Sequence, residues 1–478
     1  MLSAKNNTSF KYLCKKQNIV HLSQYIKEFS YNLKLAFPVI LGMLGHTLIG
    51  IVDNIMVGKL GSTELAAVSL GNSLIFIAMS IGIGFSTSIT PIIAEAHAEN
   101  NFDKVRSIFH NGLFLCVILG FMLFLLVVFC QPIMELLHQP KEVIVLAKPY
   151  LYWAAFSLLP LIIYQGYKQF ADGLSLTHYS MYAIILANIL HILFNYLLIY
   201  GIWIFPKMGI IGAGLGTVIS RILMVTFMHF ILASRKKLHP YFEGFGFSEI
   251  KKTVLNKIIN LGFPTALQML FEVVLFTAGI WLCGNIGKTS QAANQIALSL
   301  ASSTFMVAVG LSVVSMIRVS TQKGLRDYKS LITIARSVFI LSVLIEIIFA
   351  ILFVIFHNYL PYLFLDMDNP AQQVDNAVVI KIASKLLLVA AVFQISDGIQ
   401  VVVLGALRGL QDVIIPMYIT FVAYWLIGFP ISYYLGIYTD LKAVGVWIGL
   451  LAGLTSAALF LYIRFHYLTK KLVLENHD

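Results

Sequence analysis

Three acidic side chains with polar residues at helical spacing stand inside apolar stretches of the chain: Asp53, Glu272 and Asp397. A charged side chain at the centre of a lipid bilayer costs about 2.5–3.5 kcal/mol on insertion scales, so such residues usually face a bundle interior or a wet cavity. In that setting they can bind a cation or a proton. For Asp53, the alternative is a position near enough to its helix end to reach lipid headgroups.

In the first half of the chain, polar residues fall at helical spacing in three stretches: His46, Gly50 and Asp53; Asn188, His191 and Asn195; and Thr217 after the glycine run GAGLG. Residues spaced by three, four or seven positions share one helix face. A carboxylate, an imidazole, an amide and a hydroxyl that converge could hold a sodium ion or pass a proton. A histidine that is merely hydrogen-bonded inside the bundle is the alternative for His191.

The acids of the second half have amide neighbours. Gln268 precedes Glu272 by one turn, and Gln394 and Gln400 flank Asp397 at i−3 and i+3, on the same helix face. Carboxylates held away from water bind protons more readily, which a proton carrier needs, whereas sodium bound to oxygen ligands would keep both acids ionised. Both interpretations stay open at this point.

Two further charged residues also fall at bilayer depth. Glu346 has no charged or amide companion at helical spacing, so a functional role, a helix contact and a position at the lipid edge are equally open. Arg221 is the one basic residue that we place at the middle of a helix.

The composition defines the class of protein. With 59% hydrophobic and 12% charged residues and a mean hydropathy of +0.85, the chain is predicted to be an all-α polytopic membrane protein. Apolar windows of about 20 residues predict about twelve transmembrane helices, near 34–57, 66–92, 109–130, 148–169, 179–200, 208–233, 259–283, 291–317, 334–357, 378–405, 413–436 and 443–465. A Walker A lysine, G-x-S-x-G and H-E-x-x-H are all absent, so we do not expect an enzyme.

Basic residues predict the orientation. Most of the 33 Lys and Arg residues fall in segments that are cytoplasmic if the N-terminus is, so both termini are predicted to be cytoplasmic. The net charge of +11 then reflects topology and contact with anionic lipid, and no nucleic-acid partner is expected. We find no signal peptide. Leu22, Tyr25, Ile26, Phe29 and Leu33 form the stripe of an interfacial amphipathic helix, although the residues up to about His21 could equally be a disordered tail.

An internal repeat organises the chain. A shift of 226 residues lays LAFPVIL at 35 on LGFPTAL at 261, and a shift of 236 lays ADGL at 171 on LRGL at 407. Two six-helix bundles with an even number of spans keep the same orientation and are typical of transporters that alternate access at the interface of the halves. The predicted segments are 1–33 (cytoplasmic), 34–233 (first bundle), 234–257 (linker), 258–467 (second bundle) and 468–478 (cytoplasmic tail).

Four segments carry a resemblance to a known family: GIVDNIM, FADGLSLTH, LFEVVLF and FQISDGIQVVVLGALRG. They resemble the signature segments of multidrug and toxic compound extrusion (MATE) transporters, particularly the NorM-type branch, and the likeness runs from about Phe29 to about Tyr467. The resemblance implies a two-lobed, V-shaped antiporter that expels cationic or amphiphilic compounds against protons or sodium. On that pattern the N-lobe cation site corresponds to Asp53, Asn195 and Thr217, and the C-lobe site to Glu272 and Asp397.

The chain departs from the branch at two positions. Phe393 stands where the branch commonly has a tyrosine, which removes an oxygen ligand, and the titratable His191 stands where the N-lobe often has an asparagine. Both departures favour the proton over sodium as the coupling ion. If sodium were the ion, its ligands would be Glu272 and Asp397, or Asp53 and Asn195. The expected sites are then the C-lobe ion site with Glu272, Asp397 and Gln394, the N-lobe ion site with Asp53, His191, Asn195 and Thr217, and a substrate cavity with His46, Gln268 and Gln400.

The predicted function is secondary active multidrug efflux from the inner or plasma membrane, by a monomer that needs no cofactor beyond the coupling ion. A flippase for lipid-linked oligosaccharides is the alternative, although its cavity should be lined with Arg and Lys to bind pyrophosphate. A channel or a structural membrane protein is the third possibility, and the unlike acids of the two halves suit alternating access better than a fixed pore.

Overall fold

A computed structural model describes residues 4–136, 140–244, 246, 249–365 and 373–475, without the side chains of 4–22, 46, 62, 136, 373 and 374. This part of the chain is helical throughout its regular structure. Twelve candidate membrane spans confirm the predicted number, and each overlaps one predicted helix: Ser23–Gly58, Thr63–Ala98, Phe102–Phe129, Lys141–Gly173, Thr177–Tyr200, Ile210–Ala233, Lys252–Ile286, Lys288–Gly324, Tyr328–Phe356, Asp375–Gly409, Ile414–Ile437 and Ala443–Glu475.

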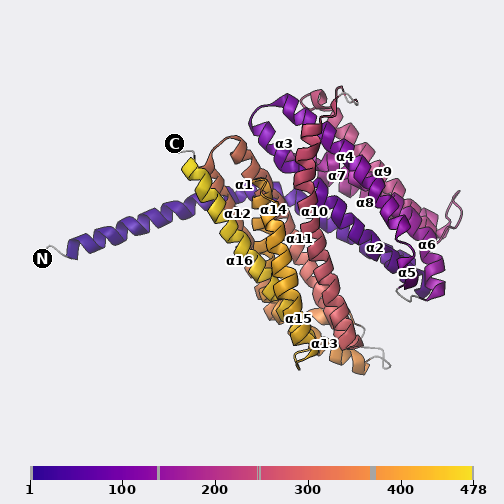
Figure 1. Ribbon diagram of the computed structural model, residues 1–478. Coiled ribbons are helices and arrows are strands. Elements are labelled where there is room, and N and C mark those ends of the chain that lie inside the picture. Colours follow the sequence, from indigo (N-terminus) through magenta and orange to yellow (C-terminus); the bar gives the residue numbers. More distant parts are fainter. Residues whose placement is uncertain (1–3, 137–139, 245, 247–248, 366–372, 476–478) are drawn as a thin grey trace.

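The first half of the chain, here the N-lobe, forms one bundle (Figure 1). Its helices are α1 (Ala4–Gly58), α2 (Ser62–Ser86), α3 (Ile89–Ala98), α4 (Phe102–Phe129), α5 (Ile133–Leu136), α6 (Lys141–Phe156), α7 (Leu158–Gly173), α8 (Thr177–Tyr200) and α9 (Ile210–Ala233). The short 3₁₀ helix η1 (His239–Tyr241) follows in the linker.

The second half, here the C-lobe, forms the other bundle (Figure 1). It contains α10 (Lys252–Ile286), α11 (Lys288–Gly324), α12 (Tyr328–Phe356), the 3₁₀ helix η3 (Leu360–Leu363), α13 (Gln373–Gly409), α14 (Ile414–Phe421), the π-helix η4 (Val422–Gly428), α15 (Phe429–Ile437) and α16 (Ala443–Glu475). Helices α14, η4 and α15 together make the eleventh span.

Each lobe has its own hydrophobic core, and the first helix of each lobe enters the core of the other. Val57 of α1 lies in the N-lobe core, whereas Leu35 and Ala36 of the same helix lie in the C-lobe core. Reciprocally, Ile258 of α10 lies in the N-lobe core. The shift of 226 residues relates α1 to α10, so this exchange follows the internal repeat.

The lobes touch closely where α3 meets α10 and α11. A Cβ added to Gly324 of α11 would lie 2.5 Å from the backbone oxygen of Glu95 on α3, so the two helices meet there without a side chain between them. The Glu95 carboxylate also faces Lys323 of α11 at 3.2 Å and Lys257 of α10 at 3.7 Å. Backbone contact and ion pairs therefore join the lobes at this end of the molecule.

The long helix α1 includes the predicted N-terminal amphipathic stretch and the first span without interruption. Leu22 of the predicted stripe lies outside the described side chains. In the rest of the stripe Phe29 packs against the C-lobe core, while Ile26 and Leu33 are exposed. Glu28 of α1 binds Arg318 of α11 at 2.6 Å, so this segment is attached to the C-lobe.

Candidate ion-coupling sites

In the N-lobe, two bonds hold the carboxylate of Asp53. Oδ1 of Asp53 on α1 lies 2.7 Å from Nε2 of His191 and accepts a hydrogen bond of 2.7 Å from Nδ2 of Asn195. His191 and Asn195 are four residues apart on α8, so both point from one helix face toward α1. Three of the four residues predicted for this site are thus brought together.

A second layer on α9 holds the imidazole of His191. Its Nδ1 lies 3.1 Å from Oγ of Ser220, and that hydroxyl donates a bond of 3.0 Å to the backbone oxygen of Thr217. The hydroxyl of Thr217, the fourth predicted residue, donates instead to the Ala213 backbone oxygen of its own helix at 2.9 Å. Thr217 therefore contributes its backbone to this network.

Arg221 lies close to the same site. Its partly buried guanidinium donates a bond of 2.6 Å to Oγ of Ser157 and interacts electrostatically with Asp53 and Tyr150. The phenol of Tyr150 in turn donates to Oδ1 of Asn72 at 2.7 Å. The sequence placed Arg221 at the middle of a helix, but it did not predict that this positive charge would lie near Asp53.

The C-lobe carboxylates have a different environment. Asp397 on α13 is 5% exposed and interacts electrostatically with Glu272 on α10. Oδ1 of Asp397 has no hydrogen-bond partner in the described part of the chain. Gln400, one turn further along α13, is fully buried, and both atoms of its amide also lack a partner there.

Two residues that the sequence analysis did not assign complete the C-lobe site. Tyr424 on η4 is fully buried and interacts electrostatically with Glu272, Asp397 and Arg408, and its hydroxyl has no partner among the described residues. Arg408, at the end of α13, donates to Oε1 of Gln268 at 3.0 Å and 3.2 Å. The sequence had given no signal for Tyr424, because a π-helix changes which residues face the bundle.

Gln394 and Gln268 bond to groups other than the carboxylates of Glu272 and Asp397. Gln394 accepts a bond of 2.9 Å from Thr304 and donates to the backbone oxygen of Glu346 at 3.5 Å. Gln268, predicted to line a substrate cavity, is 1% exposed and donates to the backbone of Val413 at 2.9 Å. His46, predicted for the same cavity, is on α1, but its side chain lies outside the part that the structure describes.

Phe393 contributes no oxygen to the C-lobe site. Its ring is 2% exposed and packs against Trp447 and Phe276, with ring centroids 5.2 Å and 6.0 Å apart. In the described residues, no group of three or more His, Cys, Asp or Glu side chains is arranged to hold a metal ion.

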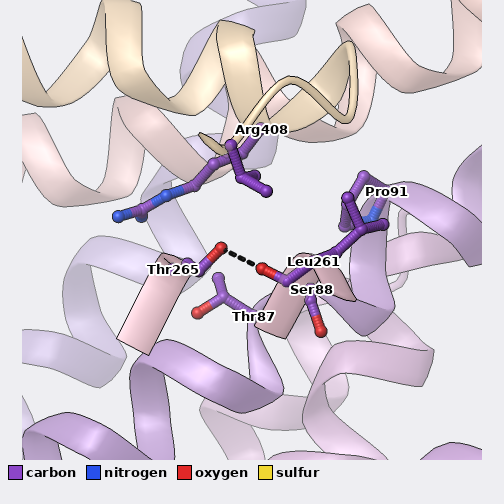
Figure 2. A pocket seen from close by; sticks show the side chains of 7 residues that line it. Thr87, Ser88, Pro91, Leu261, Thr265 and Arg408 are labelled. Carbon is purple, nitrogen blue, oxygen red and sulfur yellow. Dashed lines mark hydrogen bonds between the residues drawn. The ribbon is translucent and has the colours of Figure 1, made fainter. Parts of the chain in front are cut away.

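The seam between the lobes passes beside Arg408. Figure 2 shows a small pocket there, with Thr87, Ser88 and Pro91 from the N-lobe opposite Leu261, Thr265 and Arg408 from the C-lobe. Val413 also lines it. The pocket is too narrow to admit a water molecule. It is therefore a packed contact between the lobes and offers no room for cargo.

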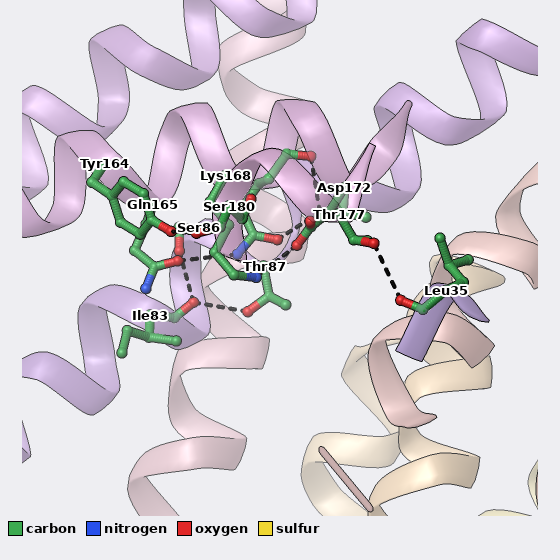
Figure 3. A network of polar contacts seen from close by, with 12 residues as sticks. Leu35, Ile83, Ser86, Thr87, Tyr164, Gln165, Lys168, Asp172, Thr177 and Ser180 are labelled. Carbon is green, nitrogen blue, oxygen red and sulfur yellow. Dashed lines mark hydrogen bonds and ion pairs between the residues drawn. The ribbon is translucent and has the colours of Figure 1, made fainter. Parts of the chain in front are cut away.

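A buried ion pair lies in the N-lobe at the position that the repeat matches to Arg408. Nζ of Lys168 and Oδ2 of Asp172 are 2.6 Å apart on α7, in a polar network that Figure 3 shows. The same figure shows the hydroxyl of Thr177, which donates to the backbone oxygen of Leu35 on α1 at 3.2 Å. This bond joins α8, the fifth span, to the part of α1 that enters the C-lobe core.

Known proteins are similar to this chain in sequence and in fold. A family model described as MatE matches residues 38–197 and 264–434, two segments that begin 226 residues apart. The chain is 31% identical to a probable multidrug resistance protein NorM of Rhizobium meliloti (93% of this chain and 94% of that protein). It is 30% identical to the multidrug resistance protein NorM of Vibrio cholerae (94% and 98%).

Solved structures agree in fold. The eukaryotic MATE transporter AtDTX14 superposes with a TM-score of 0.84 at 18% identity, over 94% of this chain and 99% of that one. An outward-facing multidrug resistance MATE transporter of the MOP superfamily superposes with a TM-score of 0.82 at 19% identity, over 92% and 96%. Twelve spans in two lobes, with buried acids in each, define a polytopic membrane transporter. The chain belongs to the MatE family, as the sequence motifs predicted.

Proposed function

We propose that this chain is a secondary active antiporter that exports cationic or amphiphilic compounds in exchange for protons. The observation that carries the proposal is the C-lobe site, where Glu272 and Asp397 interact inside the bundle and Oδ1 of Asp397 has no partner among the described residues. A carboxylate without compensating bonds in a dry site is neutralised by a proton at little cost. Relatives of this chain are multidrug resistance proteins.

In this mechanism, the C-lobe acids and the cargo compete. When the cavity faces the side with the higher proton concentration, Glu272 and Asp397 take up protons and lose the charge that attracts a cationic compound. When the cavity faces the cytoplasm, they release the protons and bind the compound. The lobes change orientation between these states, and the gradient supplies the direction of transport.

The N-lobe site is a second candidate for ion coupling, formed by Asp53, His191 and Asn195 with the backbone of Thr217. Sodium is the alternative ion there, because Asn195 can supply an amide oxygen beside the carboxylate of Asp53. Oδ1 of Asn195 has no hydrogen-bond partner in the described structure. We place the proton first, because sodium needs several oxygens and Phe393 supplies none to the C-lobe.

The flippase alternative is less well supported. Its pyrophosphate cargo needs free guanidinium or ammonium groups, whereas Arg221 is bound to Ser157 and Arg408 to Gln268. We also propose that both termini are cytoplasmic.

The experiment that tests the proposed function is uptake of ethidium into proteoliposomes under separately imposed proton and sodium gradients. Uptake driven by the proton gradient without sodium supports the proposal, and uptake that requires a sodium gradient contradicts it.

A further inference from the structure

Glu346 of α12, which its own helix gives no reason to assign, lies directly beside the C-lobe site. Its side chain is 1% exposed and packs against Gly398, the residue after Asp397. A Cβ added to Gly398 would lie 2.6 Å from Cγ and 3.3 Å from Oε1 of Glu346. The missing side chain at position 398 is therefore what lets Glu346 reach α13 at this level.

The bonding of Glu346 fits a neutral carboxylic acid. Neither of its oxygens has a hydrogen-bond partner in the described chain. An ionised carboxylate needs a counter-charge or donated hydrogen bonds when it is removed from water. Glu346 instead faces Asp397, another acid, with which it interacts electrostatically. Like charges at close range disfavour ionisation of both groups together.

The charged residues near α12 do not neutralise Glu346. On α13, Arg408 bonds to Gln268 and interacts electrostatically with Glu272 and Tyr424, and not with Glu346. On the other packed helices, Glu28 of α1 pairs with Arg318 of α11, and Arg464 of α16 pairs with Asp412. The groups that act on the Glu346–Asp397 pair are thus Glu272, which interacts with Asp397, and the Tyr424 phenol, which interacts with both Glu272 and Asp397.

A second buried polar group points to exchange at this place. Gln400 is fully buried one turn beyond Asp397, and its amide has neither donor nor acceptor satisfied by the described residues. Buried polar groups normally have partners, so several unsatisfied ones close together call for a functional or structural explanation, and a proton-carrying role is one that fits two carboxylates. Glu346, Asp397 and Gln400 form such a set.

We propose that Glu346 is a third proton-carrying residue of the C-lobe, which exchanges a proton with Asp397 during transport. In the exchange, the O–H bond of Glu346 breaks, an O–H bond forms on Asp397, and the negative charge moves from Asp397 to Glu346. The step needs no other reactant. The inference rests on the proposed proton coupling and extends it, because the C-lobe then stores one more proton than Glu272 and Asp397 can.

The test is the pH dependence of ethidium binding to the purified full-length protein. The slope of log affinity against pH counts the protons released per dye bound. We expect Glu346→Gln, which keeps the shape of the side chain, to lower this slope by up to one proton. In a variant that already carries Asp397→Asn, adding Glu346→Gln should change the slope little. The effects of two residues that exchange one proton are not additive.

Two variants separate this role from packing. Ser342→Ala removes a hydroxyl that lies 3.5 Å from the backbone oxygen of Gly398, one turn before Glu346, and should leave the slope unchanged. Gly398→Ala should displace the Glu346 side chain and lower the slope of log affinity against pH without removing a titratable group. If Glu346→Gln does not fold, Gly398→Ala replaces it as the test. A wild-type slope in Glu346→Gln, or in Gly398→Ala in that case, overturns the inference alone. A zero slope in the wild type overturns the proton coupling itself.

Discussion

Each lobe has an arginine near one of its acids, but the two lobes differ in how their carboxylates are hydrogen-bonded. In the N-lobe, Asp53 receives hydrogen bonds from α8 and lies near the charge of Arg221. In the C-lobe, Asp397 and Glu346 both have oxygens without a partner among the described residues. A compensated carboxylate remains charged and holds its neighbours in place, whereas an uncompensated one is ready to take up a proton. The difference supports our proposal that protons are transferred in the C-lobe, while the N-lobe carboxylate acts as a fixed charge.

The internal repeat makes this difference informative. The two lobes share one arrangement of helices, in which α1 and α10 enter the opposite cores at positions that the repeat matches. Yet the acids are not repeated, and the repeat sets Asp172 of the N-lobe against Arg408 of the C-lobe. Because the scaffold is shared, the unlike charges are where the two lobes can differ in function.

The largest expected effect tests the C-lobe side of the comparison. Asp397→Asn and Glu272→Gln should each slow proton-driven dye transport by roughly 100-fold, near the upper end of coupling between sites, because neither side chain can then release a proton. Transport into proteoliposomes measures this, with size-exclusion profiles to check folding.

Asp375→Asn is the matched control. It removes a carboxylate from the same helix α13, but from a solvent-exposed pair with Lys288. Exposed pairs contribute little to stability, so its transport should equal that of the wild type. If Asp397→Asn and Glu272→Gln also transport at that rate, the C-lobe acids are packing residues and the comparison fails.

A second, smaller effect tests the N-lobe side through stability. Asp53→Asn removes a charge that receives two hydrogen bonds, and bonds to a charged group are each worth about 1.5–3 kcal/mol. We expect it to lower the thermal unfolding temperature in detergent and to slow transport by roughly 10-fold, a change of about 1.4 kcal/mol. Asp397→Asn should not lower the unfolding temperature, because no bond to its Oδ1 is lost. Equal unfolding temperatures for the two variants would contradict the comparison.

Much of the fold was predictable, because membrane spans are read from hydropathy alone. Some helix ends were predicted closely, such as 208–233 against Ile210–Ala233, but several helices continue past the apolar window: the structure extends the predicted 291–317 to Lys288–Gly324. Polar residues are as helical as apolar ones once they leave the bilayer, so composition gives no boundary there.

The candidate sites were predictable only where polar residues share one helix. The spacing of His191 and Asn195 indicated that they share one helix face, and in the structure both side chains contact the carboxylate of Asp53. Glu346 and Tyr424 reach the C-lobe site from other helices, and the contact of Glu346 depends on Gly398, whose missing side chain carries no signal of its own. Contacts between helices depend on packing, which one sequence does not display.

A modest effect concerns the ion. Phe393→Tyr adds a phenolic oxygen one turn before Asp397, inside the ring contacts with Trp447 and Phe276. The wild type should transport dye without sodium, and the variant should gain stimulation of about threefold by sodium, less than 1 kcal/mol, because an added oxygen improves a sodium site. Dye uptake with and without sodium measures both. A wild-type protein that stops when sodium is removed would show that the C-lobe does not rely on protons.

The smallest effect distinguishes two neighbouring hydroxyls of α9 in the N-lobe. The Ser220 hydroxyl contacts Nδ1 of His191, whereas that of Thr217 donates to the backbone of its own helix. Ser220→Ala should therefore slow transport by about threefold, since a neutral hydrogen bond contributes about 0.5–1.5 kcal/mol. Thr217→Val keeps the shape of the side chain and the backbone oxygen that Ser220 uses, so its transport rate should stay within about twofold of the wild type. The reverse order would mean that the Thr217 hydroxyl turns toward Asp53 during the cycle, and the N-lobe carboxylate would then be an ion site that reorganises as the C-lobe does.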